Sequence, residues 1–223
     1  MAKFPHPGDE WDVMAWERTA LDLAQFAGIR TPRTALVRLD GASVLLLDRF
    51  DRHQGRRVPY ISAMTLLGAR DGDVHDYIEI AEALVDHAAA ATDDLRELWR
   101  RIAFSIAVHN TDDHLRNHGF LRTGAGWRLA PAFDVNPHPY VDTPRTTGIG
   151  GARARSDGVG ALLRYAGVLD LNAHQARSAL GEVVGALERW RDVAARNGIT
   201  AAEMSRFHDA FEGGRKALGE AIS

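Results

Sequence analysis

The first part of the chain combines one helical pattern with two short strand-like patterns. Apolar residues recur at helical spacing over residues 12–27, which predicts an amphipathic helix. Two apolar runs follow at residues 35–39 and 44–49, and the Asp-Gly pair between them is a strong hairpin signal. Residues 50–57 are charged and contain a glycine, so we interpret them as a connector. These patterns predict a small N-terminal unit that mixes α and β structure.

The chain beyond residue 60 is mainly helical in pattern. Six stretches carry apolar residues at helical spacing, at residues 61–67, 77–91, 95–108, 158–167, 172–196 and 200–219. We expect Thr92 or Asp93 to cap the start of the third stretch. A hairpin at residues 117–131 and a loop rich in proline and glycine at residues 136–151 interrupt the helices. The second unit is therefore predicted to be larger and mostly helical.

Composition and charge narrow the possible classes of protein. The 223 residues suffice for one domain or two small lobes, and 45% hydrophobic with 26% charged residues is typical of a soluble globular protein. The net charge of −3 gives no overall electrostatic reason for direct binding to nucleic acid. The chain has no cysteine, which excludes disulfides and thiolate metal sites. No apolar run approaches the roughly 20 residues of a membrane span. We therefore expect a cytoplasmic protein that does not bind membranes.

The strongest chemical pattern is Asp112 and Asn117, separated by four residues and followed by Asp134. Kinase catalytic loops use this spacing, because the carboxylate orients the substrate hydroxyl while the amide oxygen binds Mg²⁺. A second aspartate must reach the same ion after a short hairpin, and Asp134 has that place. The spacing alone is a weak signal, but the preceding helix and the following hairpin make the combination specific. The plainer alternative is that Asp112 and Asn117 belong to an ordinary loop and Asp134 caps a turn.

A metal-dependent hydrolase is a further interpretation of the same region. It would use four neighbouring side chains, those of His109, Asp112, Asp113 and His114. Such sites need more ligands on separate helices, for which His75 and His87 are available histidines. A kinase-like site is therefore the favoured hypothesis, and in that site we expect no catalytic role for Asp113.

Residues 111–117 together with residues 129–134 resemble the catalytic core of the HipA family of bacterial toxin serine/threonine kinases. Further segments that resemble the family are residues 2–5, 17–32, 47–52 and 149–151. The resemblance covers nearly the whole chain. It implies an α+β, two-lobed, protein-kinase-like fold, with a small incomplete N-lobe at residues 1–52 and a larger, mostly helical C-lobe at residues 53–223.

The resemblance implies ATP and Mg²⁺ as cofactors and assigns roles on the catalytic loop. Asp112 would be the catalytic aspartate, and Asn117 and Asp134 would hold Mg²⁺. His114 matches a family histidine that we expect to brace the loop. Arg116 replaces the usual lysine, and its guanidinium keeps the positive charge near the phosphates.

The resemblance also assigns the residues that contact ATP. Lys3 would contact the phosphates, and Glu17 would either pair with this lysine or remain a solvated helix charge. The backbone of Arg49 and Phe50 would meet the adenine, and Asp51 would lie near the ribose.

The resemblance finally implies a function and a set of partners. The expected activity is that of a toxin kinase acting on a translation component such as an aminoacyl-tRNA synthetase. A HipB-like helix-turn-helix antitoxin would be its partner and would provide its contact with DNA. Full-length family members carry an N-terminal subdomain and a phosphate-covering loop before the lysine strand. Three explanations compete for this difference: a misplaced start or truncated gene, a separate N-terminal subdomain protein, or an inactive pseudokinase that docks a partner.

Overall fold

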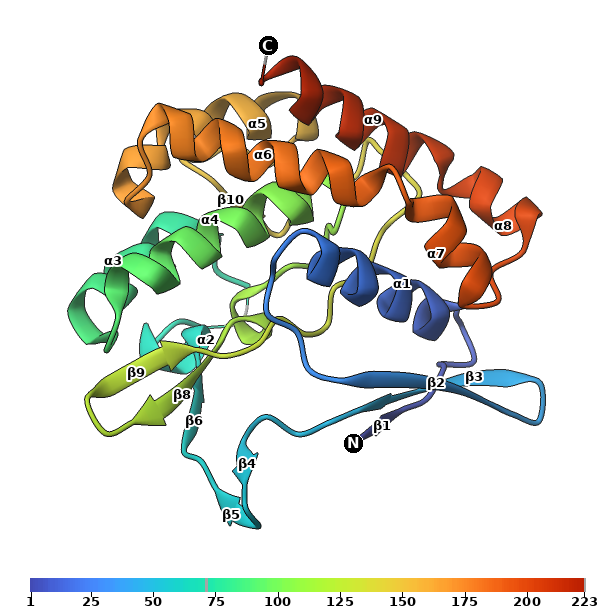
Figure 1. Cartoon of the computed structure of the whole chain (residues 1–223), viewed down its shortest axis with the longest axis horizontal. Coiled ribbons are helices and arrows are strands. Elements are labelled where there is room, and N and C mark those ends of the chain that lie inside the picture. Colours follow the sequence, from blue (N-terminus) through green and yellow to red (C-terminus); the bar gives the residue numbers. More distant parts are fainter. Residues whose placement is uncertain (71, 223) are drawn as a thin grey trace.

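The N-terminal residues form a three-stranded antiparallel sheet covered by one helix. The computed structural model describes residues 1–70 and 72–222, so Asp71 and Ser223 of the expected C-lobe lie outside the described part. The sheet has the order β1 (Ala2–Lys3), β3 (Ala42–Leu47), β2 (Thr34–Leu39), and α1 (Val13–Phe26) packs against it. Figure 1 shows this sheet at one side of the molecule, with α1 between it and the helical layer. The expected helix and hairpin are both confirmed.

A small second hairpin occupies the segment that we interpreted as a connector. Strands β4 (Arg52–His53) and β5 (Arg56–Arg57) pair antiparallel. The turn between them has φ values of 49° at Gln54 and 78° at Gly55. Two successive residues with positive φ are the geometry of a tight two-residue turn. The connector prediction was therefore incomplete, and the hairpin projects away from the body in Figure 1.

The second unit is built around another three-stranded sheet and a group of helices. Its sheet has the order β6 (Tyr60–Ser62), β8 (Gly119–Thr123), β9 (Gly126–Leu129). The expected hairpin at residues 117–131 is confirmed. The expected helix at residues 61–67 is only partly present, because its first residues pair with β8 and a single turn, α2 (Ala63–Leu66), follows.

The helices of the second unit follow the predicted order with different boundaries. They are α3 (Tyr77–His87), α4 (Ala91–Ala107), α5 (Arg155–Arg164), α6 (Ala173–Leu187), α7 (Trp190–Arg196), α8 (Ala201–Arg206) and α9 (His208–Glu220). Short elements between them are β7 (His75–Asp76), η1 (Leu115–Asn117), β10 (Thr147–Gly148) and η2 (Ala166–Leu169). The expected cap at Thr92 or Asp93 is wrong, because α4 begins one turn earlier and its N-cap residue, Ala90, makes no side-chain cap bond.

Two helices that we expected to be continuous are each broken once. Residues 172–196 divide into α6 and α7, and residues 200–219 divide into α8 and α9. The breaks direct Trp190 and Phe207 into the core, where both side chains are buried. Phe207 stacks on Trp16 of α1 with ring centroids 4.0 Å apart, and Trp190 stacks on Phe211 at 4.8 Å. Tertiary packing of large aromatic side chains thus overrides the continuous helical pattern.

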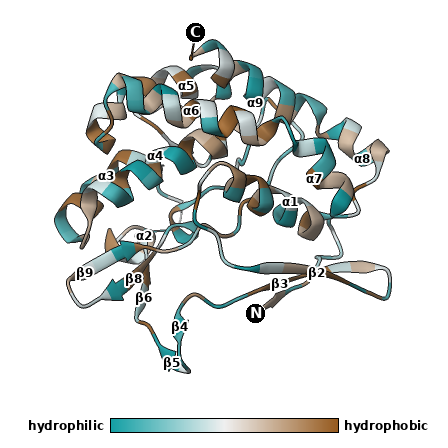
Figure 2. Ribbon diagram, in the orientation of Figure 1, coloured by the Kyte–Doolittle hydropathy of each residue, from teal (hydrophilic) through white to brown (hydrophobic). Residues whose placement is uncertain are grey.

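The main core lies between α1, α4, α6 and α9. Helix α4 passes through its centre, and Leu98, Trp99 and Ile102 have no exposed surface. Figure 2 shows that α4, α6 and α9 each carry both hydrophobic and hydrophilic residues, as amphipathic helices do. Within the described residues, no helix combines the length and the apolar character needed to cross a membrane.

Candidate active site

Three charged side chains from distant parts of the chain meet at the edge of the N-terminal sheet. Lys3 lies on β1, Glu17 on α1, and Asp134 in the loop after β9. The Lys3 Nζ lies 2.7 and 2.8 Å from the two carboxylate oxygens of Glu17 and 2.6 Å from Asp134 Oδ1. The Asp134 backbone N–H also donates to Glu17 Oε1 at 3.0 Å. The structure thus brings together three of the residues assigned from the sequence, and Glu17 is paired rather than solvated.

Lys3, Glu17 and Asp134 form an ion cluster, in which burial and neighbouring charges shift the pKa values of Lys3 and Glu17 in opposite directions. Glu17 is 1% exposed, and burial raises the pKa of its carboxyl while the hydrogen bonds from Lys3 and Asp134 oppose that shift. Burial also favours the neutral form of Lys3, but the charges of Glu17 and Asp134 outweigh it and raise the pKa of Lys3. Lys3 is therefore a firmly protonated ammonium that links the sheet to the Asp134 loop.

The loop that carries Asp134 is held at its start by a buried acid of α4. Asp94 is fully buried and accepts hydrogen bonds from Arg30 at 2.9 Å, Arg128 at 2.9 Å and the Leu129 backbone N–H at 3.1 Å. The Ala132 backbone N–H then donates to the carbonyl oxygen of Arg30 at 2.7 Å. A buried carboxylate surrounded by donors in this way fixes the backbone that precedes Asp134.

Asp134 itself has an unusual backbone conformation. Its φ is 59°, in the left-handed region that non-glycine residues rarely adopt. The Asn136 side-chain N–H donates to Asp134 Oδ1 at 3.1 Å, so this oxygen is shared between Asn136 and Lys3. The other oxygen, Oδ2, accepts no hydrogen bond from any described residue. Strained residues of this kind cluster at functional sites, and the Asp134 side chain is 36% exposed.

The predicted catalytic loop lies against the Asp134 loop. The His138 backbone N–H donates to the carbonyl oxygen of His109 at 3.1 Å, and Asn110 bridges to Pro137. Asn117 and Phe133 both line a cavity of about 30 Å³ between the two segments. The predicted residues Asp112, Asn117 and Asp134 therefore lie on two segments that are packed side by side.

The four predicted residues of the catalytic loop differ in their surroundings. Asp112 and Arg116 are exposed, His114 is half-buried, and Asn117 is buried. The Asn117 side-chain N–H donates to the Asp112 carbonyl oxygen at 3.1 Å, which turns its Oδ1 away from this bond. The His114 Nδ1 is buried and has no hydrogen-bond partner among the described residues, so the expected bracing role stays a prediction.

Asp113 is the anchor of this loop, a role that we did not predict. Its carboxylate accepts hydrogen bonds from Tyr77 of α3 at 2.6 Å, Ser105 of α4 at 3.0 Å and His118 at 2.9 Å. Burial would raise the pKa of Asp113, but the His118 charge and these three donors lower it to about 2. Asp113 thus ties the loop to two helices and leaves its neighbour Asp112 at the surface.

We expect Asp113 to make the fold sensitive to acid. Its pKa of about 2 lies below that of an aspartate in an unfolded chain, so it stabilises the fold above about pH 4 and loses this effect as the pH falls to 2. Measured with urea, the free energy of unfolding of the native chain should fall by about 2 kcal/mol more between pH 6 and pH 2 than that of Asp113→Asn. An equal pH dependence of the two proteins would contradict this role.

The alternative of a histidine-rich metal site receives no support. His109 is buried, and its Nε2 lies 2.9 Å from the Tyr140 carbonyl oxygen. Burial and then the charge of Arg155 lower the pKa of His109 to about 4. Across residues 1–70 and 72–222, no group of three or more His, Asp or Glu side chains could hold a metal ion.

A pocket lies where the sequence resemblance placed the adenine. Its volume is about 280 Å³, and its lining includes Met1, Leu47, Phe50, Asp51, Tyr60 and Phe133. The Phe50 ring lies 5.5 Å from Phe133 and 6.1 Å from Tyr60, measured between centroids. Arg49 also lines the pocket, so all three predicted hinge residues are found here. An apolar pocket with aromatic walls suits a flat heterocycle.

The oxygen atoms near the two loops fit a hard divalent cation. Asp134 Oδ2 and Asn117 Oδ1 accept no hydrogen bond within the described part of the chain. Mg²⁺ is typically held by one or two protein oxygens together with phosphate oxygens and water. This donor set therefore matches Mg²⁺ with a bound nucleotide better than a metal ion held by protein ligands alone.

Comparison with known proteins gives a consistent result. Residues 1–191 match the family model described as the HipA-like C-terminal domain. A Haemophilus influenzae protein described as an inferred kinase is 26% identical over 144 residues, which cover 56% of this chain and 42% of that protein. The chain therefore spans less than half the length of this relative.

Two solved structures have a similar fold. HipA from the Shewanella oneidensis MR-1 complex of HipA, HipB and operator DNA aligns with a TM-score of 0.78 and 15% identity, covering 98% of this chain and 57% of that one. The Helicobacter pylori proinflammatory kinase CtkA aligns with a TM-score of 0.75 and 14% identity, covering 100% and 87%. These alignments confirm the expected α+β, two-lobed, kinase-like fold.

Proposed function

Because the chain belongs to the HipA family, whose C-terminal domain model matches residues 1–191, we propose that it is an ATP- and Mg²⁺-dependent serine/threonine protein kinase. A kinase-like function follows from the family, and the finer activity is our inference. The observation that carries it is the contact of Lys3 with both Glu17 and Asp134, beside the loop of Asp112 and Asn117. A strand lysine paired with a helix glutamate is the arrangement that kinases use to hold ATP phosphates.

In the proposed reaction, each group has a separate task. Asp112 accepts the proton of the substrate hydroxyl, and its exposure leaves it accessible to a protein substrate. Lys3 positions the phosphates of ATP while Glu17 holds its ammonium in place. Asn117 and Asp134 would hold Mg²⁺, which when bound would neutralise the charge that develops on the transferred phosphoryl group. Arg116 adds positive charge on the same loop, and His114 supports the loop.

The nucleotide is proposed to enter the aromatic pocket at the hinge. The adenine would lie near Phe50, with the backbone of Arg49 and Phe50 as its hydrogen-bonding edge. Asp51 would be near the ribose, although its carboxylate is already bound by Arg49 at 2.8 and 2.6 Å. In this proposal residues 1–52 form the N-lobe and residues 53–223 the C-lobe, and α1 joins them because it also packs on α6 and α7.

The partners are proposed by analogy with the family. The S. oneidensis relative was solved with HipB and operator DNA, so we propose a HipB-like helix-turn-helix antitoxin that provides the contact with DNA. The substrate would be a translation component such as an aminoacyl-tRNA synthetase, which makes the chain a toxin that acts in the cytoplasm. A separate N-terminal subdomain protein is a further proposed partner. The alternative is an inactive pseudokinase that only docks such partners.

Phosphoryl transfer should depend on Asp134. With γ-labelled ATP and Mg²⁺, the chain should label itself or an added synthetase, and Asp134→Asn should reduce the rate at least about 10²-fold. The exposed Asp142 lies in the same loop, and its side chain makes no hydrogen bond or ion pair with any described residue, so Asp142→Asn provides the control variant with an unchanged rate. If the native chain neither transfers label nor shows a thermal shift with ATP and Mg²⁺, but does shift with an antitoxin-like partner, the pseudokinase alternative is correct.

A further inference from the structure

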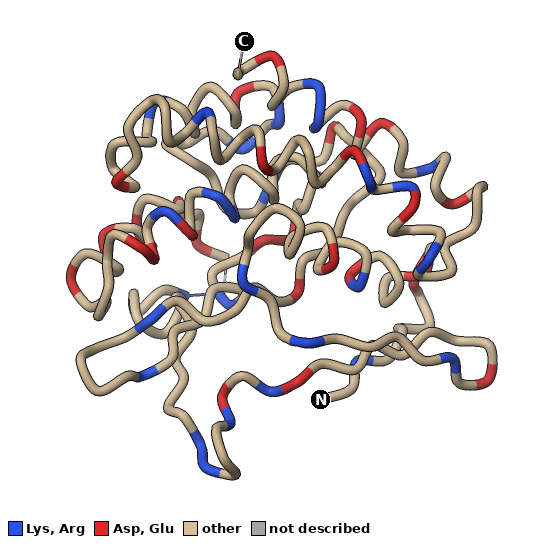
Figure 3. Tube along the Cα trace, in the orientation of Figure 1, with Lys and Arg blue, Asp and Glu red and all other residues tan. Residues whose placement is uncertain are grey.

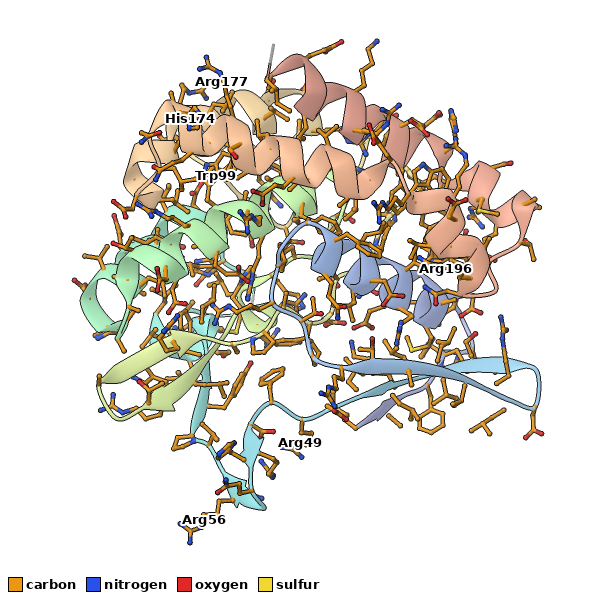
Figure 4. The ribbon with its side chains drawn as sticks, viewed as in Figure 1. Arg49, Arg56, Trp99, His174, Arg177 and Arg196 are labelled. Atoms are coloured by element: carbon orange, nitrogen blue, oxygen red, sulfur yellow. The ribbon has the colours of Figure 1, made fainter. Side chains whose placement is uncertain are left out.

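The small hairpin of β4 and β5 concentrates positive charge on an otherwise acidic protein. Residues 49–57 contain four arginines and a single acid, Asp51, whereas the whole chain has a net charge of −3. Figure 3 shows Lys and Arg along the hairpin and at its tip, with acidic residues only toward its base. Figure 4 shows Arg56 at the tip, extending away from the body. The hairpin is therefore a basic arm.

The charges of this basic arm are only partly compensated. Arg49 and Arg52 share the Asp51 carboxylate, with contacts of 2.6 and 2.5 Å. The hydrogen bonds and charges of these arginines lower the pKa of Asp51 to about 2, so it remains an anion. Arg56 and Arg57 are exposed and make no side-chain hydrogen bond or ion pair with any described residue. At least two guanidinium groups at the tip are thus open to an external anion.

The strand register places arginines opposite each other, which destabilises the basic arm. Arg52 lies directly opposite Arg57, and His53 lies opposite Arg56. Like charges directly across a strand pair are destabilising, and a two-stranded hairpin is marginally stable on its own. None of the residues 52–57 is buried, so no core contact offsets this cost. A local conflict of this kind is typical of a functional surface.

We propose that the basic arm docks an acidic segment of the protein substrate, an inference that rests on the proposed kinase function. The arm begins at the rim of the hinge pocket, since Asp51 belongs to both. A carboxylate of the substrate placed between opposed arginines would relieve their repulsion and accept paired hydrogen bonds.

Two observations favour a polypeptide over a nucleic acid. Single strands are bound by aromatic side chains on which bases stack, whereas the one aromatic residue of residues 49–57, Phe50, lies against Phe133 and Tyr60 in the hinge pocket. A nucleic acid also needs a positive field along several phosphates, whereas the chain as a whole is acidic.

Charge reversal at the tip tests the proposal directly. The test protein is Arg56→Glu/Arg57→Glu, which removes the like-charge pair of Arg52 and Arg57 and therefore should fold with an unchanged melting temperature. The matched control is Arg177→Glu/Arg196→Glu, because these two helical arginines are also exposed and unpaired among the described residues, and they lie far from the arm (Figure 4). Both variants change the net charge equally.

Binding is measured by fluorescence anisotropy with a labelled decaglutamate peptide and, in parallel, a labelled uridine decamer. The peptide's Kd should rise about tenfold in the arm variant and less than about twofold in the control, and binding should weaken with salt. An equal effect of both variants, no effect, or tighter binding of the uridine decamer through the same arginines would overturn the proposal. The binding assay contains no nucleotide, so a failure of phosphoryl transfer would not affect its result.

Discussion

Replacing Asp112 by asparagine should reduce the rate of phosphoryl transfer about 10²- to 10⁴-fold while leaving ATP binding nearly unchanged. The carboxylate is exposed on a loop that Asp113 anchors, so its removal takes away the proton acceptor without disturbing the fold. Turnover is measured with γ-labelled ATP and affinity by a thermal shift with ATP and Mg²⁺.

Asp113, the neighbouring aspartate, is compared with Asp112 by the effect of each substitution on the free energy of unfolding. Asp112→Asn should change the free energy of unfolding by less than about 0.5 kcal/mol, because it is a surface substitution. Asp113→Asn should destabilise the protein, because Asp113 is buried among three donors. Full turnover in Asp112→Asn would show that another group accepts the hydroxyl proton.

Replacing Lys3 by methionine should destabilise the protein by about 3 kcal/mol at pH 7, because it leaves the buried Glu17 carboxylate without its cation. Glu17→Gln should destabilise the protein less, since Asp134 still pairs with the ammonium of Lys3. The double variant should be less destabilised than the sum of the two single variants, because the unpaired charge is absent. Urea unfolding of the native chain, the two single variants and the double variant gives the four free energies of this double-mutant cycle.

An exposed ion pair gives the matched control for this cycle. Lys216 lies 3.9 Å from Glu220 near the C-terminus, and its side chain is 76% exposed. Lys216→Met should therefore change the free energy of unfolding by less than about 0.5 kcal/mol. A similarly small effect of Lys3→Met would show that the Lys3 cluster does not stabilise the fold.

The local features of the fold could be predicted from the sequence, whereas the breaks within helices could not. The Asp40-Gly41 turn has φ values of 49° and 84°, the backbone that this residue pair favours. The division between α6 and α7 has no local signal, because both halves keep a helical pattern. It arises from the burial of Trp190 beside α1, which is a contact between the two ends of the chain.

The site shows the same distinction between local and long-range information. The spacing of Asp112, Asn117 and Asp134 identified two loops that the structure packs together, and their proposed roles stay predictions. Tyr77 and Ser105 were missed, because they reach Asp113 from two separate helices. No spacing rule connects such residues, so only the folded structure reveals them.

The N-terminal helix reaches its final surroundings only through residues made much later. Trp16 of α1 packs on Phe207, and Lys3 contacts Asp134 across 131 positions of sequence. During synthesis, the part of α1 that packs on Phe207 therefore stays uncovered until that residue has left the ribosome. Early chains expose hydrophobic surface that chaperones recognise, and they lack an assembled ion cluster. The ion cluster of the candidate site can thus assemble only after Asp134 has been synthesised, and α1 is fully packed only after Phe207 has followed.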